Sequence, residues 1–343
     1  MKRGTTLFIL IISLIMPLVL AADVNISNAN NTNDEDSKIN KAYSCLEDKV
    51  VDNCDDLSLE EKIFSLLSLG ECKDELISEA EGDKECWPSG NCDVKLTAIA
   101  LLALDEAGTS ASDAEDWLLS QYTVPSNVNW FLEIENPNGE TSCTITYSNS
   151  SYAGISIQED KKISPGSQGL GSCLSLESNA YWLNIAPSCY DKEFKISCSE
   201  GFLTTLLFKK DDSSTIHVSE DAHTASAEGA TTETVNSLCF SEGSSCNYEG
   251  SLWATFVLDY LDHDVSAYIP YLVTTAEDNE RYLPKSFLFR LTGYSDFKND
   301  LLLKQKSKYW DESGDKFYDT ALAMYSLYEN SQEEKNTEDW LLE

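Results

Sequence analysis

The chain has 343 residues and a formal net charge of -35, from 59 acidic and 24 basic residues. Affinity for phosphate backbones and anionic lipid surfaces is built from lysine and arginine, so this composition excludes nucleic acid as a partner. Eleven cysteines in one chain indicate disulfides and therefore an oxidising compartment.

The first 22 residues are predicted to be a signal peptide. A basic start is followed by an apolar run from Leu7 to Leu20 and then by two alanines suited to cleavage. The run has roughly 14 residues, fewer than the 20 or so that a spanning helix needs. We expect a secreted, extracellular or cell-surface protein with no membrane span after cleavage, beginning with a flexible leader over residues 23–37 that is rich in Asn and Asp.

Close cysteine spacing marks four candidate disulfides, although spacing alone does not fix the connectivity. The odd total leaves one thiol unpaired. No Cys-x2-Cys spacing supports a zinc site, so neither a metal nor a cofactor is expected. The candidate pairs are Cys45/Cys54, Cys86/Cys92, Cys189/Cys198 and Cys239/Cys246.

A helical pattern covers residues 38–121 and returns over residues 239–343. The two parts share a repeat, because residues 93–120 align without a gap onto residues 316–343 with ten of 28 positions identical. In each copy a helix that is apolar all round precedes one that is apolar on a single side, as an inner and an outer helix would be. Repeated helical units predict a ring or solenoid whose function lies in its concave face.

Residues 122–218 have a different periodicity, with about seven short alternating segments separated by Asn, Gly, Pro and Ser turns. This pattern predicts an antiparallel β-sandwich inserted into the helical part. A segment rich in Ser, Thr, Ala and Glu, residues 219–238, is predicted to be the linker that returns to the helices.

At the repeat the chain resembles the terpenoid cyclase/protein prenyltransferase superfamily. Thr97-Ala98 and Asp319-Thr320-Ala321 head the inner helices, and residues 305–310 resemble the Gln-to-Trp motif of the cyclases with one residue fewer. The resemblance implies an α/α toroid of alternating inner and outer helices. The expected fold is therefore α+β and multidomain, an α/α toroid incomplete at its C-terminus with an inserted antiparallel β-sandwich.

The catalytic motifs of that superfamily are not retained. Lys95 stands where a class II cyclase has its proton-donating Asp, and the second copy keeps only Asp319. The zinc ligands of the prenyltransferases are missing, since no cysteine accompanies His263 with metal spacing. The thioester motif of the complement-like relatives is absent as well.

Three acids remain as catalytic candidates, namely Asp93, Asp319 and Glu249. Two carboxylates across a cavity can share acid and base work in sugar cleavage. The simpler interpretation of Asp93 and Asp319 is that each caps the N-terminus of an inner helix. Glu249 belongs to a segment that also contains His263, for which a solvated helix end is the simpler interpretation.

Two functions are carried forward from the sequence. The first is a non-catalytic binding or scaffold module, secreted or on the cell surface, whose unknown ligand is a glycan or a surface protein. The second is a glycan hydrolase or lyase that uses carboxylates in the cavity of the helical part.

Overall fold

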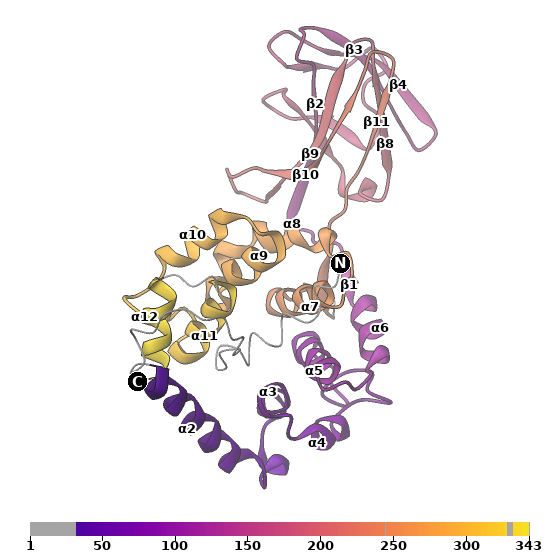
Figure 1. Cartoon of the computed structure of the whole chain (residues 1–343). Coiled ribbons are helices and arrows are strands. Elements are labelled where there is room, and N and C mark those ends of the chain that lie inside the picture. The colour runs from indigo at the N-terminus through magenta and orange to yellow at the C-terminus, as the bar shows by residue number, and fades with distance from the viewer. Residues whose placement is uncertain (1–31, 244, 328–331, 343) are drawn as a thin grey trace. The chain divides into compact units, whose positions relative to one another are not determined.

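The computed structural model describes residues 32–243, 245–327 and 332–342, and the chain divides into two compact units. The first, here called the helical unit, comprises residues up to Thr123, then Cys239–Val265 and Ala276–Glu343. The second, here called the sheet unit, comprises Val124–Leu238 and Ser266–Thr275. Figure 1 shows both, with the elements labelled along the chain.

Successive helices of the helical unit pack side by side in the order α3, α5, α7, α9 and α11 (Figure 1). Shorter helices pack beside several of them, α4 against α3, α6 against α5, α10 against α9 and α12 against α11. The helices are α2 Thr32–Val50, α3 Leu59–Leu69, α4 Lys73–Ser78, α5 Val94–Glu106, α6 Ser112–Ser120, α7 Tyr248–Tyr260, α9 Pro284–Thr292, α10 Ser295–Leu303, α11 Lys316–Leu327 and α12 Gln332–Leu341, with short 3-10 turns at Cys54–Asp56 and Ala276–Tyr282.

Helices α5 and α7 are apolar on nearly every side, and most of their residues are buried. A helix of this kind is stable only when neighbours cover it all round. Between α9, α10 and α11 a smaller core forms around Leu283, Leu301 and Trp310, the last of which is 1% exposed. The apolar periodicity of the sequence thus becomes a row of helices with α5 and α7 at its centre.

One hydrogen-bond arrangement recurs at the start of α5 and α11. The backbone N–H of Trp87 donates to Thr97 Oγ1 at 2.9 Å, and the indole N–H of Trp87 donates to the carbonyl of Leu76 at 2.8 Å. In the second copy, Trp310 donates in the same way to Thr320 Oγ1 at 3.1 Å and to the carbonyl of Leu301 at 2.7 Å. The predicted repeat is therefore matched by equivalent contacts.

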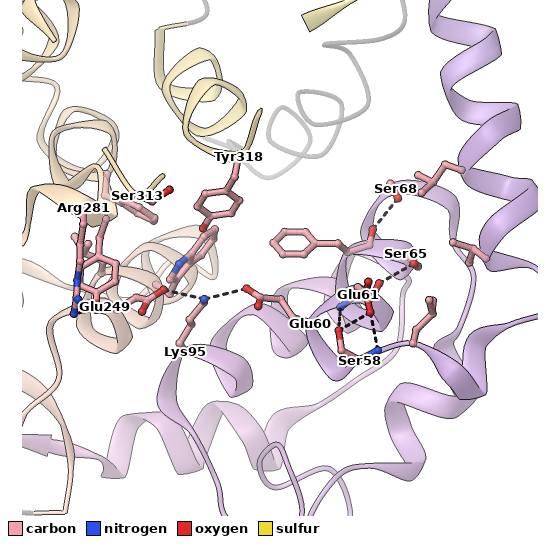
Figure 2. A pocket seen from close by; sticks show the side chains of 18 of the residues that line it. Ser58, Glu60, Glu61, Ser65, Ser68, Lys95, Glu249, Arg281, Ser313 and Tyr318 are labelled. Atoms are coloured by element: carbon pink, nitrogen blue, oxygen red, sulfur yellow. Dashed lines mark hydrogen bonds and ion pairs between the residues drawn. The ribbon is translucent and has the colours of Figure 1, made fainter. Parts of the chain in front are cut away.

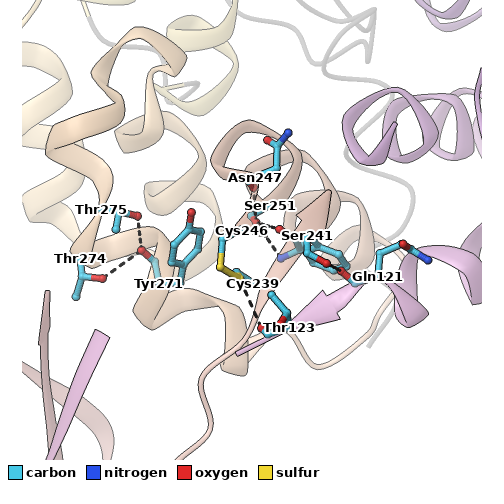
Figure 3. Close-up of a disulfide and its surroundings, with 11 residues drawn as sticks. Gln121, Thr123, Cys239, Ser241, Cys246, Asn247, Ser251, Tyr271, Thr274 and Thr275 are labelled. Carbon is cyan, nitrogen blue, oxygen red and sulfur yellow. Dashed lines mark hydrogen bonds between the residues drawn. A yellow bond between two sulfur atoms is a disulfide. The ribbon is translucent and has the colours of Figure 1, made fainter. Parts of the chain in front are cut away.

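A third copy of the arrangement precedes α7, where the backbone N–H of Phe240 donates to Ser251 Oγ at 2.9 Å. Its loop is closed by the Cys239–Cys246 disulfide, and the loop before α5 by Cys86–Cys92. Figure 3 shows the disulfide near Thr123, Ser241 and Gln121, with Ser251 on the adjoining helix. In each case a buried hydroxyl holds the loop to the helix that follows it.

The sheet unit contains two five-stranded antiparallel sheets, in the orders β10-β9-β2-β7-β6 and β11-β8-β3-β4-β5. Alternate residues are buried in strands such as β2, β3 and β8, as sheets with one face on a core require. The strands are β2 Val128–Glu135, β3 Thr141–Tyr147, β4 Ser150–Ile157, β5 Ile163–Ser164, β6 Leu174–Leu176, β7 Trp182–Ile185, β8 Glu193–Cys198, β9 Phe202–Lys210, β10 His217–Ala225 and β11 Ala230–Thr234, with a 3-10 turn at Pro187–Cys189.

A third antiparallel sheet lies within the helical unit. It joins β1 Tyr122–Thr123 to β12 Cys239–Glu242, and β12 to β13 Ser245–Cys246. The N–H of Ser241 also donates to the carbonyl of Gln121 at 2.8 Å (Figure 3). The chain therefore leaves the helical unit and returns to it on hydrogen-bonded neighbouring strands.

The prediction of an α/α toroid is wrong as the fold class of this chain. The described residues are a mixture of helices and three antiparallel sheets, two of them five-stranded, so sheet structure makes up too much of the fold. Helical periodicity and the repeat indicate that neighbouring helices pack together, but they do not determine the architecture of the chain. The α+β composition and an antiparallel sheet structure after residue 122 agree with the prediction.

Two predicted boundaries also differ from the structure. The predicted linker over residues 219–238 contains most of β10 and all of β11. In β11 the buried residues are polar, Thr231 and Glu233, and their neighbours are exposed. The mean hydropathy of the segment is therefore low, and its composition resembles that of a linker. The predicted leader over residues 23–37 overlaps α2, which begins at Thr32. The predicted signal peptide, residues 1–22, lies outside the described residues.

The helix over Ile269–Thr274, α8, and the 3-10 turn Ser266–Tyr268 were expected in the helical part but belong to the sheet unit. There α8 packs against β2 and β9. Its buried residues, Tyr271 and Leu272 among them, provide an apolar face of the kind that any core can accept. Periodicity alone does not distinguish the two destinations.

Five disulfides form among the described residues, and Cys45 is an exposed free cysteine. Two of the four close pairs are disulfides in the structure, and the other two pairings are wrong. Cys54 pairs with Cys72 rather than with Cys45. Cys198 pairs with Cys143, which faces it on the adjacent strand, and Cys189 pairs with Cys173. The bonds are Cys54–Cys72, Cys86–Cys92, Cys143–Cys198, Cys173–Cys189 and Cys239–Cys246.

The role of the buried hydroxyls can be tested by replacing Thr97 with valine, which keeps the shape of the side chain and removes the hydroxyl. The N–H of Trp87 is then buried without an acceptor, so we expect the free energy of unfolding to fall by about 1–3 kcal/mol. Thr97→Ser keeps the hydroxyl and is the control. Urea unfolding should separate the two variants, and equal midpoints would show that the hydroxyl does not hold the loop.

Candidate functional site

A cavity of about 770 Å³ lies entirely within the helical unit, and is here called the polar cavity because ion pairs lie at its centre (Figure 2). Its walls combine serine and tyrosine hydroxyls, three acids, three basic residues and several large apolar side chains. The residues that carry the argument below are Glu60, Lys95, Glu249, Arg281 and Tyr318, with Phe64, Trp253 and Phe287 as aromatic walls.

The centre of the polar cavity is an ion-pair cluster. Lys95 Nζ lies 2.9 Å from Glu60 Oε1 and 2.8 Å from Glu249 Oε1, and the lysine side chain is 20% exposed. Burial lowers the pKa of Lys95, but hydrogen bonds to Glu249 and Glu60 outweigh this effect and hold the pKa well above its usual value. The ammonium therefore stays charged and bridges two carboxylates from different helices, as Figure 2 shows.

The three members of this cluster occupy the same position on three helices. Ser58, Asp93 and Asn247 are the N-caps of α3, α5 and α7, and each side chain accepts a hydrogen bond from the N–H three residues later. Glu60, Lys95 and Glu249 follow these caps by two residues. Because the caps fix the start of each helix in the same register, the second residue of each helix faces the polar cavity.

Tyr318 of α11 completes this layer of the cavity. The capping carboxylate of Asp315 accepts hydrogen bonds from the backbone N–H groups of Phe317 and Tyr318, both at 3.0 Å. Burial raises the pKa of Tyr318 to about 12, an effect opposed by the charge of Lys95. Its phenol therefore remains a neutral hydrogen-bonding group near the ion-pair cluster (Figure 2).

A second, apolar cavity of about 510 Å³ lies in the same unit. It shares Phe64, Trp253, Phe287 and Tyr318 with the polar cavity, so the two spaces have a common aromatic wall. The rings of Trp253 and Phe287 pack edge to face, with their centres 5.0 Å apart. The other walls are mainly aliphatic and aromatic, and come from Ala42, Leu67, Ile99, Leu102, Phe256, Ser286, Arg290, Ala321, Leu322, Tyr325, Glu338, Leu341 and Leu342.

Of the three acids proposed from the sequence, Glu249 lines a cavity, whereas Asp93 and Asp319 line neither. Asp93 caps α5 by accepting from the N–H of Leu96 at 2.8 Å. Asp319 is fully buried and accepts from the N–H groups of Glu312 and Ser313, at 2.6 and 2.7 Å, and from the hydroxyl of Ser313. It holds the loop before α11, which has no disulfide of the kind found before α5 and α7.

His263, which follows the end of α7, lines neither cavity. Its Nε2 lies 2.6 Å from Oε1 of Glu115 in α6. Nearby, burial raises the pKa of Asp105, and the charge of Glu115 raises it further. No cluster of three or more His, Cys, Asp or Glu side chains suited to a metal ion occurs in the described ranges.

Sequence reasoning missed Glu60 altogether and treated Lys95 only as a lost catalytic acid. The available signal was the shared offset from three polar N-caps, which places Glu60, Lys95 and Glu249 in register. Ser286 and Tyr325 had no signal, because a hydroxyl in an apolar helix is usually satisfied by the helix backbone.

Comparison with protein-family models, with curated proteins and with solved structures finds no significant match to this chain. The resemblance to the terpenoid cyclase/protein prenyltransferase superfamily therefore stays a prediction. The geometry of the two cavities is therefore the basis for inferring a function.

Replacing Lys95 with methionine would leave Glu60 and Glu249 facing each other without a cation. We expect the free energy of unfolding to fall by roughly 1–3 kcal/mol near neutral pH, between the values typical of exposed and buried pairs. Because the pKa of Lys95 is raised in the folded state, its contribution is fully present below the unfolded pKa of about 10.4 and is lost as pH rises through the folded pKa.

Urea unfolding of wild type and Lys95→Met should therefore show a constant gap from about pH 7 to 9 that narrows above about pH 10. Adding Glu60→Gln and Glu249→Gln to the methionine variant removes the carboxylate repulsion and should recover part of the lost stability. A gap that widens at high pH would contradict the assignment.

Proposed function

We propose that the helical unit is a non-catalytic binding module for an amphipathic small molecule. The observation that carries this proposal is the pair of cavities that share an aromatic wall, one with an ion-pair cluster at its centre and one almost entirely apolar. Their volumes, about 770 and 510 Å³, fall in the range of roughly 300–1,000 Å³ typical of ligand sites. A molecule with a polar and an apolar part fits this division.

The environment of the protein supports binding outside the cytosol. Five disulfides join described cysteines, which fits an oxidising compartment and an extracellular protein. Across the described residues no helix is long and apolar enough to cross a membrane. We propose further that the protein acts as a secreted or cell-surface module, with the ligand held in the helical unit.

A second candidate, a glycan hydrolase, is favoured by the two carboxylates of the polar cavity. Glu60 Oε1 and Glu249 Oε1 lie 2.9 and 2.8 Å from one nitrogen atom, so these two oxygens are at most 5.7 Å apart (2.9 + 2.8). This limit is compatible with the separation of about 5–5.5 Å between the carboxyl groups of retaining enzymes. However, Lys95 Nζ lies between them, where a glycosidic oxygen would have to sit. The binding function therefore has the stronger support.

The binding function can be tested by filling the apolar cavity. Ala321 lines it from an exposed position on α11, so Ala321→Trp adds bulk to the cavity without entering a packed core. We expect this variant to weaken binding of the fluorescent amphiphile anilinonaphthalene sulfonate by about tenfold or more, while the free energy of unfolding changes by about 0.5 kcal/mol or less.

The matched control is Ala107→Trp, which adds the same side chain at an exposed site that lines neither cavity. This control should bind the probe as the wild type does. Equal losses in both variants, or a wild type that does not bind, would reject the binding function.

The hydrolase alternative predicts turnover of nitrophenyl glycosides that disappears in Glu249→Gln. We expect no turnover from the wild type, because Lys95 occupies the space between the carboxylates. Turnover that requires both Glu60 and Glu249 would replace the binding function with the second candidate.

A further inference from the structure

The apolar cavity is lined by two buried hydroxyl groups whose protons have no acceptor in the described part of the protein. Ser286 is the third residue of α9 and is 1% exposed, and Tyr325 of α11 is 9% exposed. Both line the apolar cavity. Within the described ranges Ser286 Oγ has no hydrogen-bond partner. The proton of the Tyr325 phenol has no acceptor either, although Arg290 interacts with the phenol oxygen as a donor. A buried hydroxyl without a partner costs about 1–3 kcal/mol, so its retention calls for an explanation.

A positive charge lies beside these hydroxyls. Arg290 follows Ser286 by one helical turn on α9, also lines the apolar cavity, and has its guanidinium 5.3 Å from the centre of the Tyr325 ring. Burial raises the pKa of Tyr325 to about 12 even though Arg290 opposes the rise. At neutral pH the lining of the apolar cavity therefore includes two O–H groups and a guanidinium, all of which can donate hydrogen bonds.

The rest of the wall decides what kind of molecule would meet these donors. Glu338 is the one acid among the residues that line the apolar cavity, and the others are mainly aliphatic or aromatic. Such a wall favours a hydrocarbon, and the donors favour an oxygen with a partial negative charge on that hydrocarbon. A carbonyl oxygen at the end of an alkyl chain combines both features.

We propose that the apolar cavity binds a long-chain acyl lipid whose carbonyl oxygen accepts hydrogen bonds from the hydroxyls of Ser286 and Tyr325. This inference rests on the binding function proposed above and names its ligand class. Free fatty acids and their esters share the carbonyl, and Arg290 distinguishes them because a carboxylate gains more than an ester from a guanidinium.

Ser286→Ala tests the inference, with Thr255→Val as the matched control. Thr255 Oγ1 is likewise buried without a partner in the described protein, but Thr255 lines neither cavity. Palmitate, methyl palmitate and hexadecane would be titrated as competitors of the fluorescent probe. We expect Ser286→Ala to weaken the two acyl ligands by roughly three- to tenfold and to leave hexadecane unchanged. Thr255→Val should change none of the three.

The unfolding midpoint of the ligand-free protein is a second measurement, which distinguishes a ligand-binding role of Ser286 from a purely structural one. Removing an unsatisfied hydroxyl should leave the ligand-free protein as stable as the wild type or more stable, so Ser286→Ala should lose acyl binding without losing its unfolding midpoint. Tyr325→Phe should behave in the same way. Arg290→Gln should weaken palmitate and spare methyl palmitate if the free acid is the natural form.

The outcomes distinguish this inference from the function on which it rests. If neither the probe nor any of the three lipids binds the wild type, the binding function itself fails. If the lipids bind equally to wild type and Ser286→Ala, the binding function stands and the acyl assignment is overturned. A wild type that prefers hexadecane to both acyl ligands would overturn it as well.

Discussion

The hydrogen bond from an aromatic residue's backbone N–H to a hydroxyl inside the following helix organises the helical unit. It joins Trp87 to Thr97, Phe240 to Ser251 and Trp310 to Thr320. Each bond fixes a loop against the first turns of a helix, and the N-caps of α3, α5 and α7 hold those turns in one register. The ion-pair cluster of the polar cavity depends on this alignment, because its side chains come from three separate helices.

The charge distribution around the polar cavity differs from that of the chain. The net charge of the protein is -35, yet the cavity is lined by three acids and three basic residues. Both arginines of the described ranges, Arg281 and Arg290, line a cavity. Acids on the surface are solvated and need no partner, whereas acids in a cavity are stable only with nearby cations. At the centre of the polar cavity, Lys95 supplies the cation that Glu60 and Glu249 require.

The fold was predictable where local chemistry decides it. The helical pairs, the strand-rich segment and the short-range disulfides follow from periodicity, turn residues and spacing. The fold class was not predictable from the sequence. The Thr-rich strand β11 has too few apolar residues to differ in composition from a linker, and the buried face of α8 could pack against more than one core. The disulfide Cys143–Cys198 depends on the pairing of β3 with β8, and Cys173–Cys189 joins the turns that flank the paired strands β6 and β7, so neither follows from local spacing.

The candidate site was predictable only in part. Glu249 was identified as an acid near a helix start. Asp93 caps α5 as predicted, whereas Asp319 lies inside α11 and binds the preceding loop, because Asp315 is the residue that caps this helix. The role of Lys95 as the cation of an ion-pair cluster is evident only from its contacts with Glu60 and Glu249, which are distant from it in sequence. The only signal of this convergence in the sequence is the shared two-residue offset of these side chains from three polar N-caps.

The assignment of Ser266–Thr275 to the sheet unit has a consequence for the modularity of the protein. The polypeptide crosses between the units four times. The sheet unit is therefore made of two segments of the chain, and a single deletion cannot remove it. Deleting residues 124–238 alone would remove the core against which Tyr268, Tyr271 and Leu272 are buried and would expose these side chains to solvent. Inheritance of the two units as an inseparable pair is the expected outcome.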